Sequence, residues 1–349
     1  MNPYEDLPSR CFWRPAISQV SPFNIRDLYT KKFEIEAQDK VATAGSCFAQ
    51  HIARRMAKAG FRYCDFEPPP PIFPPERMAE YNYGVYSARY CNIYTVRQLL
   101  QTFQRAFGKF VPKQEFWLDE DGVRDQFRPL VEPRPFSDVT EARNSREAHY
   151  ESVRKLLKST SLFIFTLGLT EAWEDITDGS ILPVCPGTQG GKFDPEIHRF
   201  VNFRTNEIAA DFQEFMDLCA GVNPNLKFLL TVSPVPLTAT ATGNHVLTAT
   251  TYSKSALRAV AGELADTYAN IAYFPSYEII ASSPFRGMFF EPNMRSVNEH
   301  GVDFVMTNFF RAHPPVLSGA APSSVPSTAP EKSDADVICE EMLLEMYAK

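Results

Sequence analysis

The segment spanning residues 41–51 constrains the fold of this chain more than any other. It reads Val-Ala-Thr-Ala-Gly-Ser-Cys-Phe-Ala-Gln-His, an apolar run followed by a Gly-Ser pair and an amphipathic stretch. This order predicts a buried strand over residues 40–44 and a helix over 47–59, with Ser46 between them. Because the unpaired N–H groups at a helix start favour negative charge, Ser46 is a candidate nucleophile with backbone oxyanion donors. Serine is also a preferred N-cap residue, so a purely structural role fits the same pattern.

Apolar strands and amphipathic helices alternate along the rest of the chain. We expect further strands at residues 61–64, 161–166, 226–232 and 271–274, and helices at 93–107, 141–158, 205–220, 250–268 and 297–311. This alternation predicts a doubly wound α/β sheet, in which ligands bind beyond the carboxyl ends of the strands. Ser46, residues 168–170 and residues 233–235 each follow a strand, so they are expected to meet at one edge of the sheet.

The chain divides into segments of different character. Residues 1–35 are predicted to form an irregular lead-in, and residues 36–312 the α/β domain. An insertion at about 66–140 is expected to contain a small hairpin, and its role as a lid is left open. A linker rich in Pro, Ser and Ala follows at 313–333. Residues 334–349 form an acidic amphipathic segment that either docks a protein partner or packs on its own domain.

Composition excludes several classes of protein. With 349 residues and a net charge of −7, the chain lacks the basic face of a nucleic-acid-binding protein. No apolar run is long enough for a membrane span, and no secretory leader is visible at the N-terminus. The seven cysteines show no Cys-x-x-Cys or zinc spacing, which predicts reduced thiols in a cytoplasmic protein with no metal site and no cofactor.

Several motifs in order resemble one protein family. The segment Gly-Ser-Cys-Phe-Ala at residues 45–49 resembles the signature of the GSCFA family, which itself looks like a branch of the SGNH/GDSL hydrolase superfamily. Further blocks that look like this family lie at residues 87–95, 166–173, 231–235 and 252–258, within a span of 36–312. The resemblance implies a flavodoxin-like three-layer α/β/α domain. It also implies a hydrolase or acyltransferase acting on O-acyl esters, commonly of carbohydrates or glycoconjugates.

The resemblance also implies roles for particular residues. Ser46 matches the nucleophile, and the oxyanion donors would come from Ser46, from Cys91 in place of a glycine, and from Thr170 in place of an asparagine. The family's Asp-x-x-His base is absent, because Asn293 and Ser296 occupy those two positions.

Other residues are candidates for the missing base. His300 and His245 are expected near the active edge, whereas His149 and His313 are expected to be exposed. Cys47 is an alternative nucleophile at the helix start, although a buried thiol is the commoner state. The pattern Ser296-x-x-Glu299 predicts a capping box at the start of the last helix.

Four residues are candidates for substrate binding: Arg89, Asn92, Glu171 and Arg295. Salt bridges and solvated carboxylates are the alternative roles for the charged members of this set. Lys254 and Arg258 share a helix face that is expected to contact solvent or acidic loops. The sequence therefore predicts an SGNH-like enzyme for a small-molecule or carbohydrate ester, with a non-catalytic binding or scaffold protein as the alternative.

Overall fold

The computed structural model describes residues 2–315 and 340–348. Its centre is a parallel sheet in the order β1-β4-β8-β9. The strands are β1 (Val41–Gly45), β4 (Leu162–Leu167), β8 (Lys227–Val232) and β9 (Ile271–Tyr273). Tyr63 adds only an isolated parallel bridge to Val41, so the strand expected at residues 61–64 is reduced to one pair. With Tyr63 counted, the spatial order is the 2-1-3-4-5 of flavodoxin-like folds, which confirms the predicted fold class.

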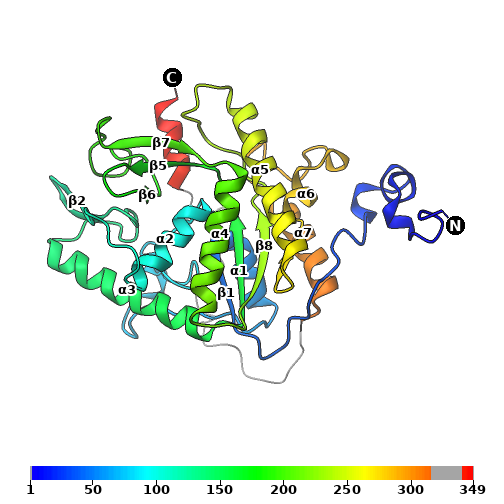
Figure 1. Ribbon diagram of the computed structural model, residues 1–349, viewed down its shortest axis with the longest axis horizontal. Helices are drawn as coiled ribbons and strands as arrows, with labels where there is room; N and C mark the ends of the chain where they lie inside the picture. The colour runs from blue at the N-terminus through cyan, green and yellow to red at the C-terminus, as the bar shows by residue number, and fades with distance from the viewer. Residues whose placement is uncertain (1, 316–339, 349) are drawn as a thin grey trace.

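Helices cover both faces of this sheet and complete the three layers (Figure 1). One face carries α1 (Phe48–Lys58), α6 (Ser276–Ala281) and α7 (Glu299–Ala312). The other carries α2 (Val96–Ala106), α3 (Val139–Ser159), α4 (Thr205–Ala220) and α5 (Val246–Thr267).

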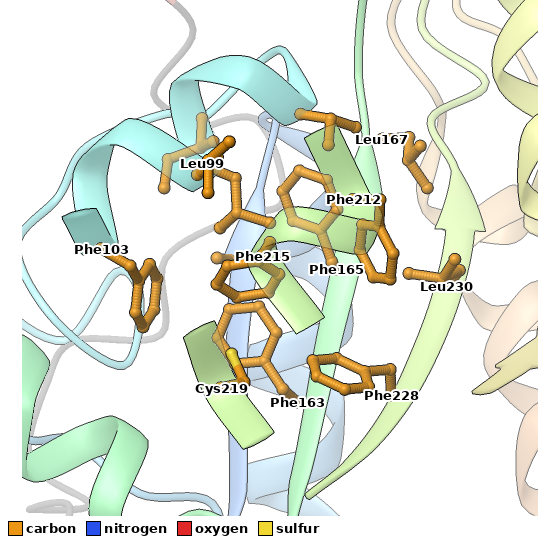
Figure 2. Close-up of a cluster of buried hydrophobic side chains, with 14 of the residues drawn as sticks. Leu99, Phe103, Phe163, Phe165, Leu167, Phe212, Phe215, Cys219, Phe228 and Leu230 are labelled. Carbon is orange, nitrogen blue, oxygen red and sulfur yellow. The ribbon is translucent and has the colours of Figure 1, made fainter. Parts of the chain in front are cut away.

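Alternate side chains of each central strand pack into the two helical layers, because successive side chains of a strand point to opposite faces of the sheet. Phe163 and Phe165 of β4 pack with Phe212 and Phe215 of α4 (Figure 2). Ile164, between them in sequence, packs into the opposite layer instead. A fully buried parallel sheet therefore reads as a continuous apolar run, which is why β4 and β8 were predictable.

Two small antiparallel sheets accompany the central parallel sheet. The expected hairpin is present as β2 (Phe116–Asp119) and β3 (Gly122–Asp125). A second small sheet, β6-β5-β7, was not predicted. Its strands are β5 (Glu171–Asp175), β6 (Ser180–Leu182) and β7 (His198–Asn202). The short, partly exposed sequences of β5 and β7 lack a clear period, so pattern alone could not identify them.

Several helix starts differ from the sequence prediction, among them α2 at Val96 and α3 at Val139, and at two others a side-chain cap sets the start. Helix α5 begins at Val246, four residues early, because the His245 side chain caps it by accepting from the Leu247 N–H at 3.1 Å. Helix α7 begins at Glu299 and is capped by Asn298, whose Oδ1 accepts from the Gly301 N–H at 2.9 Å. The predicted capping box is therefore wrong, since Ser296 lies outside the helix.

The remaining elements are short helical turns. They are η1 (Ser9–Cys11), η2 (Arg14–Ser18), η3 (Pro22–Asn24), η4 (Pro75–Arg77), η5 (Ser283–Phe285) and η7 (Glu340–Tyr347). The first three occupy the expected irregular lead-in. Most of the predicted linker, at 316–333, lies outside the described residues, as do residues 334–339 of the predicted C-terminal helix. Across residues 2–315 and 340–348, no helix combines the length and apolarity needed to cross a membrane.

Candidate active site

Ser46 directly follows β1. The neighbouring strands β1 and β4 lead to helices on opposite faces of the sheet, β1 to α1 and β4 eventually to α4. Strand β1 continues into α1 on one face, whereas β4 continues into the loop at Gly168 and then into β5. The Ser46 N–H donates to the Thr166 carbonyl of β4 at 3.3 Å, and the Ser46 carbonyl accepts from the Ala49 N–H at 2.8 Å. Ser46 therefore sits at the topological switch point, where ligands of open α/β sheets bind.

Two glycines allow the backbone to close tightly around Ser46. Gly45 has φ +142°, and a Cβ there would lie 2.5 Å from the Thr166 carbonyl oxygen. A Cβ on Gly168 would lie 2.9 Å from Ser46 Cβ and 3.0 Å from the Tyr94 carbonyl oxygen. Both contacts are too short for any larger residue, so the sequence needs glycine at both positions. The Tyr94 carbonyl also accepts from the Gly168 N–H at 3.1 Å, which ties three chain segments together at Ser46.

The Ser46 hydroxyl does not cap the helix. Ser46 is 3 % exposed, and its Oγ has no hydrogen-bond partner within the described part of the chain. A capping serine would accept from a backbone N–H in the first turn of the helix, so the structural explanation by N-capping is wrong. The buried hydroxyls of Thr166 and Thr170 likewise lack a partner among the described residues. Buried polar atoms of this kind are rare and call for an explanation, of which catalysis is one.

The three expected oxyanion donors differ in their local geometry. Cys91 is buried and has φ +60°, the left-handed conformation that favours glycine, in agreement with the glycine that the resemblance places there. Thr170 is fully buried, its N–H donates to Ser253 Oγ at 3.0 Å, and its own hydroxyl has no partner in the described chain. The N–H of Ser46 is engaged by β4, as described above.

Asn92 lies beneath the Ser46 backbone rather than in an open cavity. It is 1 % exposed, its Oδ1 accepts from Gln50 Nε2 at 3.4 Å, and it hydrogen-bonds the Tyr86 hydroxyl. That hydroxyl also lies 3.3 Å from the Ser46 carbonyl oxygen. The arrangement holds the turn that presents Ser46.

Neither candidate histidine reaches Ser46 Oγ by a hydrogen bond. His245 is exposed, and its Nδ1 is used to cap α5. His300 is exposed in the first turn of α7. At the positions of the missing base, Asn293 Nδ2 donates to Ser296 Oγ at 3.0 Å, and Asn293 Oδ1 accepts from the Arg295 N–H at 2.9 Å. These residues form a local turn, with the Arg295 side chain half-buried.

Two histidines expected to be exposed are instead buried. His149 is 2 % exposed and its Nδ1 lies 2.6 Å from Glu67 Oε2. His313 is 1 % exposed, with Nε2 3.1 Å from the Tyr29 hydroxyl. Burial lowers the pKa of His313 to about 4, and burial together with Arg128 lowers the pKa of His149. Both rings are therefore neutral at pH 7 and serve packing.

Lys254 is the site residue that sequence reasoning placed wrongly. It is 1 % exposed, not solvated, and its Nζ donates to the Gly168 carbonyl at 2.7 Å. Gly168 thus contacts both Ser46 and Lys254. Helical spacing could have predicted this burial. Lys254 precedes Leu257 and Ala261 by three and seven residues, which places all three on the same, buried face of α5. Arg258, by contrast, pairs with Glu278 as expected for an acidic neighbour.

A mostly apolar cavity of about 290 Å³ opens next to the Gly168 loop. Tyr94 and Leu169, the neighbours of Gly168 described above, form its inner end, and Glu171 contributes a carboxyl group. Burial raises the pKa of Glu171, although its Oε1 accepts a hydrogen bond from the Thr240 hydroxyl at 2.8 Å. The outer walls come from β5, β7, the loops at 183–188 and 237–241, and Leu344 and Tyr347 of η7. In Figure 1, η7 is the red helix that crosses β5 and β7.

Arg89 belongs to a different part of the molecule. Its Nε donates to the Tyr81 carbonyl at 2.8 Å, and its Nη2 contacts the Val131 carbonyl at 2.9 Å and Glu132 at 2.6 Å. The guanidinium also lies 4.1 Å from the centroid of the Tyr83 ring. Arg89 therefore braces the insertion and lines another cavity, which does not include Glu171.

Cys47 is buried at the start of α1, in the state that the sequence favours for a thiol there. No cluster of three or more His, Cys, Asp or Glu suited to a metal ion occurs within the described residues.

Comparison with known proteins identifies the family. The model of the GSCFA family matches residues 40–309, which is most of the chain, so the chain belongs to the GSCFA family. No curated protein matches it.

Proposed function

We propose that this GSCFA family member is an SGNH-like serine hydrolase or acyltransferase acting on O-acyl esters, with a carbohydrate or glycoconjugate as the acylated partner. One observation carries the proposal. Ser46 lies at the switch point of the sheet, and its buried hydroxyl neither caps the helix nor bonds any other described group. A hydroxyl kept without a partner costs stability, and a role in chemistry accounts for that cost.

The proposed reaction proceeds through an acyl-enzyme. Ser46 Oγ attacks the ester carbonyl as its proton passes to a base, giving a tetrahedral oxyanion. Collapse of this intermediate expels the alcohol, which takes the proton, and leaves the acyl group on Ser46. Water or an acceptor hydroxyl then attacks, loses its proton to the same base and releases the acid or the new ester. Either outcome regenerates Ser46.

We favour Lys254 as the base over His300 and His245. Both histidines are exposed, whereas Lys254 is buried and shares Gly168 with Ser46. Serine–lysine pairs are an established alternative to the Ser-His-Asp triad, and burial is what makes a lysine able to accept a proton. In this arrangement the Thr170 hydroxyl and the Cys91 N–H are the proposed oxyanion donors, because the Ser46 N–H already donates to the Thr166 carbonyl.

The acyl group of the substrate is assigned to the cavity beside Gly168. Its lining is mainly apolar, and its inner residues, Tyr94 and Leu169, contact the Gly168 backbone that borders Ser46. A pocket of this character binds apolar groups with a few polar contacts for orientation, and the Glu171 carboxyl is suited to a sugar hydroxyl at its wall.

The decisive experiment is labelling of the full chain with a fluorophosphonate probe, followed by peptide mapping. Covalent labelling needs an activated serine, so we expect modification of Ser46 and its loss in Ser46→Ala. Turnover of p-nitrophenyl acetate and butyrate should fall at least about 10³-fold in the same variant. Ser233→Ala is the matched control, because Ser233 is also buried after a strand of the sheet. Full turnover by Ser46→Ala would sink the proposal.

A non-catalytic binding or scaffold protein is the second candidate. Two observations favour it: Asn293 and Ser296 bond each other where the base would lie, and Ser46 is only 3 % exposed. This candidate predicts no labelling of Ser46 together with retention of ligand binding in Ser46→Ala. The same probe therefore separates the two functions.

We propose two further properties, a cytoplasmic location and contact with a protein partner. None of the six cysteines in the described part of the chain forms a disulfide, which supports a cytoplasmic location. Helix η7 contributes Leu344 and Tyr347 to the cavity wall while Met346 and Leu343 remain exposed, so a protein partner would contact its outer side. Fractionation of cells and crosslinking at Met346 test these two proposals.

A further inference from the structure

A third, much smaller cavity lies between the insertion and α3, and Ser46 is not part of its lining. It measures about 10 Å³, close to the smallest space that holds one water-sized particle. Its lining is dominated by charged and aromatic side chains: Tyr90, Thr102, Arg105, Asp125, Phe127, Arg128, Arg146, His149 and Tyr150. Three guanidinium groups thus surround a single small void.

Several donors at this void have no acceptor. Arg105 is 7 % exposed and Arg128 is 3 % exposed, yet Arg105 Nε, Arg105 Nη1 and Arg128 Nη2 are buried without a hydrogen-bond partner among the described residues. Arg105 donates one hydrogen bond, from Nη2 to Thr102 Oγ1 at 3.3 Å. Guanidinium donors buried in this way are costly unless something accepts from them.

The charges are also out of balance at the void. Asp125 is the one carboxylate in its lining, and it binds Arg128 Nε at 3.0 Å and Arg146 Nε at 3.1 Å. The other carboxylates lie behind these two arginines, with Glu67 3.9 Å from Arg128 and the partly exposed Glu115 3.4 Å from Arg146. Arg105 pairs with no carboxylate in the described chain. In place of an ion pair, its charged form is favoured by Tyr150 and Asp125 and by the Phe127 ring, whose centroid lies 3.7 Å from the guanidinium carbon.

The remaining lining groups are neutral at pH 7 and cannot balance this charge. Burial raises the pKa of Tyr90 and Tyr150 above their ordinary values, so both hydroxyls stay protonated. His149 is neutral because burial and Arg128 lower its pKa. Arg105 keeps its charge, since burial and Arg146 lower its pKa only to about 10. The void therefore presents positive charge and spare N–H donors together.

We propose that this void is a binding site for one small monovalent anion of the halide class, with chloride as the natural occupant. A halide accepts several hydrogen bonds from different directions and carries the missing negative charge. A water molecule would satisfy some donors but would leave the Arg105 charge unbalanced. The void has no room for phosphate, sulfate or a carboxylate, which limits the site to monatomic ions.

The first test is thermal unfolding of the full chain in sodium chloride, sodium bromide and sodium gluconate at equal ionic strength. Because a ligand that binds only the folded state stabilises it, we expect Tm to rise by about 2–4 °C in the halides, with saturation at high concentration. Arg105→Met should remove this difference, while Arg143→Met, an exposed change on α3, should keep it. Equal shifts in the wild-type protein and Arg105→Met would mean a general salt effect and would overturn the proposal.

The second test does not depend on the variant folding. Wild-type crystals grown or soaked in bromide should show an anomalous peak within hydrogen-bond distance of Arg105 and Arg128. A water molecule without anomalous signal at that position would overturn the proposal, as would an empty void. Neither test involves Ser46, so the outcome of both tests is independent of the proposed ester chemistry.

Discussion

Two buried polar regions of this molecule are built on opposite principles. The rim cluster (Ser46, Thr166, Thr170 and Lys254) contains three hydroxyls that bond nothing among the described residues. The insertion cluster (Glu67, Asp125, Arg128, Arg146 and His149) is held by charged contacts. Burial alone would raise the pKa of Asp125, but Arg146 and Arg128 hold it well below its usual range. The paired charges specify how the insertion packs. The unpaired hydroxyls of the rim cluster instead indicate a place where a bound ligand would supply the missing hydrogen-bond partner.

The largest expected effect comes from removing the central charge of the insertion cluster. Asp125→Asn leaves Arg128 and Arg146 buried without their shared carboxylate, and we expect a loss of about 3–5 kcal/mol in the free energy of unfolding. Asp121→Asn is the control, because its surface pair with Arg124 should contribute at most about 1 kcal/mol. Urea denaturation of both variants gives the comparison. Equal losses would show that the cluster does not anchor the insertion.

A substitution of Lys254 tests the chemistry of the rim cluster. Both Lys254→Arg and Lys254→Met should lower the rate of fluorophosphonate labelling at least about 10²-fold, since neither side chain accepts a proton. Lys254→Arg keeps a donor for the Gly168 carbonyl, so it should be the more stable of the two. The exposed Lys155→Met serves as control. A Lys254→Arg enzyme that labels at the normal rate would exclude Lys254 as the base.

The loss of stability at low pH is expected to come from the insertion cluster, through Glu67. Although burial would raise the pKa of Glu67, contacts with His149 and Arg128 bring it down to about 2, below the 4.5 of the ordinary group. A carboxyl with a lowered folded-state pKa stabilises the protein above pH 4.5 and loses that contribution as the pH falls toward 2. Between pH 5 and pH 2, the free energy of unfolding of Glu67→Gln should therefore fall by about 2–3 kcal/mol less than that of the wild-type protein.

The readout is urea unfolding across that pH range, with Glu151→Gln, an exposed carboxyl on α3, as the matched variant. If Glu67→Gln and Glu151→Gln follow the wild-type curve equally, the contact with His149 does not set the acid sensitivity.

The smallest expected effect is the stability of Ser46→Ala. Since the buried hydroxyl bonds nothing in the described chain, its removal should not lower the free energy of unfolding and should raise it by at most about 1 kcal/mol. Thr231→Val offers the contrast, because its hydroxyl donates to the Phe274 carbonyl at 2.7 Å and its loss should cost about 1–3 kcal/mol. Chemical denaturation measures both. A large loss in Ser46→Ala would mean that the hydroxyl has a structural partner after all.

The sequence was informative where local periodicity decides the structure. Strands β4 and β8 and helix α4 follow from their apolar patterns, and Ser46 from the turn that joins β1 to α1. Contacts between distant residues were not predictable in this way. His149 is buried because it meets Glu67, 82 positions earlier, and Lys254 because it meets the carbonyl of Gly168, 86 positions earlier. Such partners are set by topology, which one sequence's local pattern does not reveal.

The ion pair between β3 and α3 limits how far the insertion can move. Asp125 at the end of β3 is bonded to Arg146 of α3, so swinging the insertion away would expose a buried ion pair on both sides. The insertion is thus held in place. The cavity beside Gly168 is lined mainly by β5, β7, the loop at 237–241 and two residues of η7. We therefore expect a substrate of the proposed enzyme to enter past these elements rather than past the hairpin of the insertion.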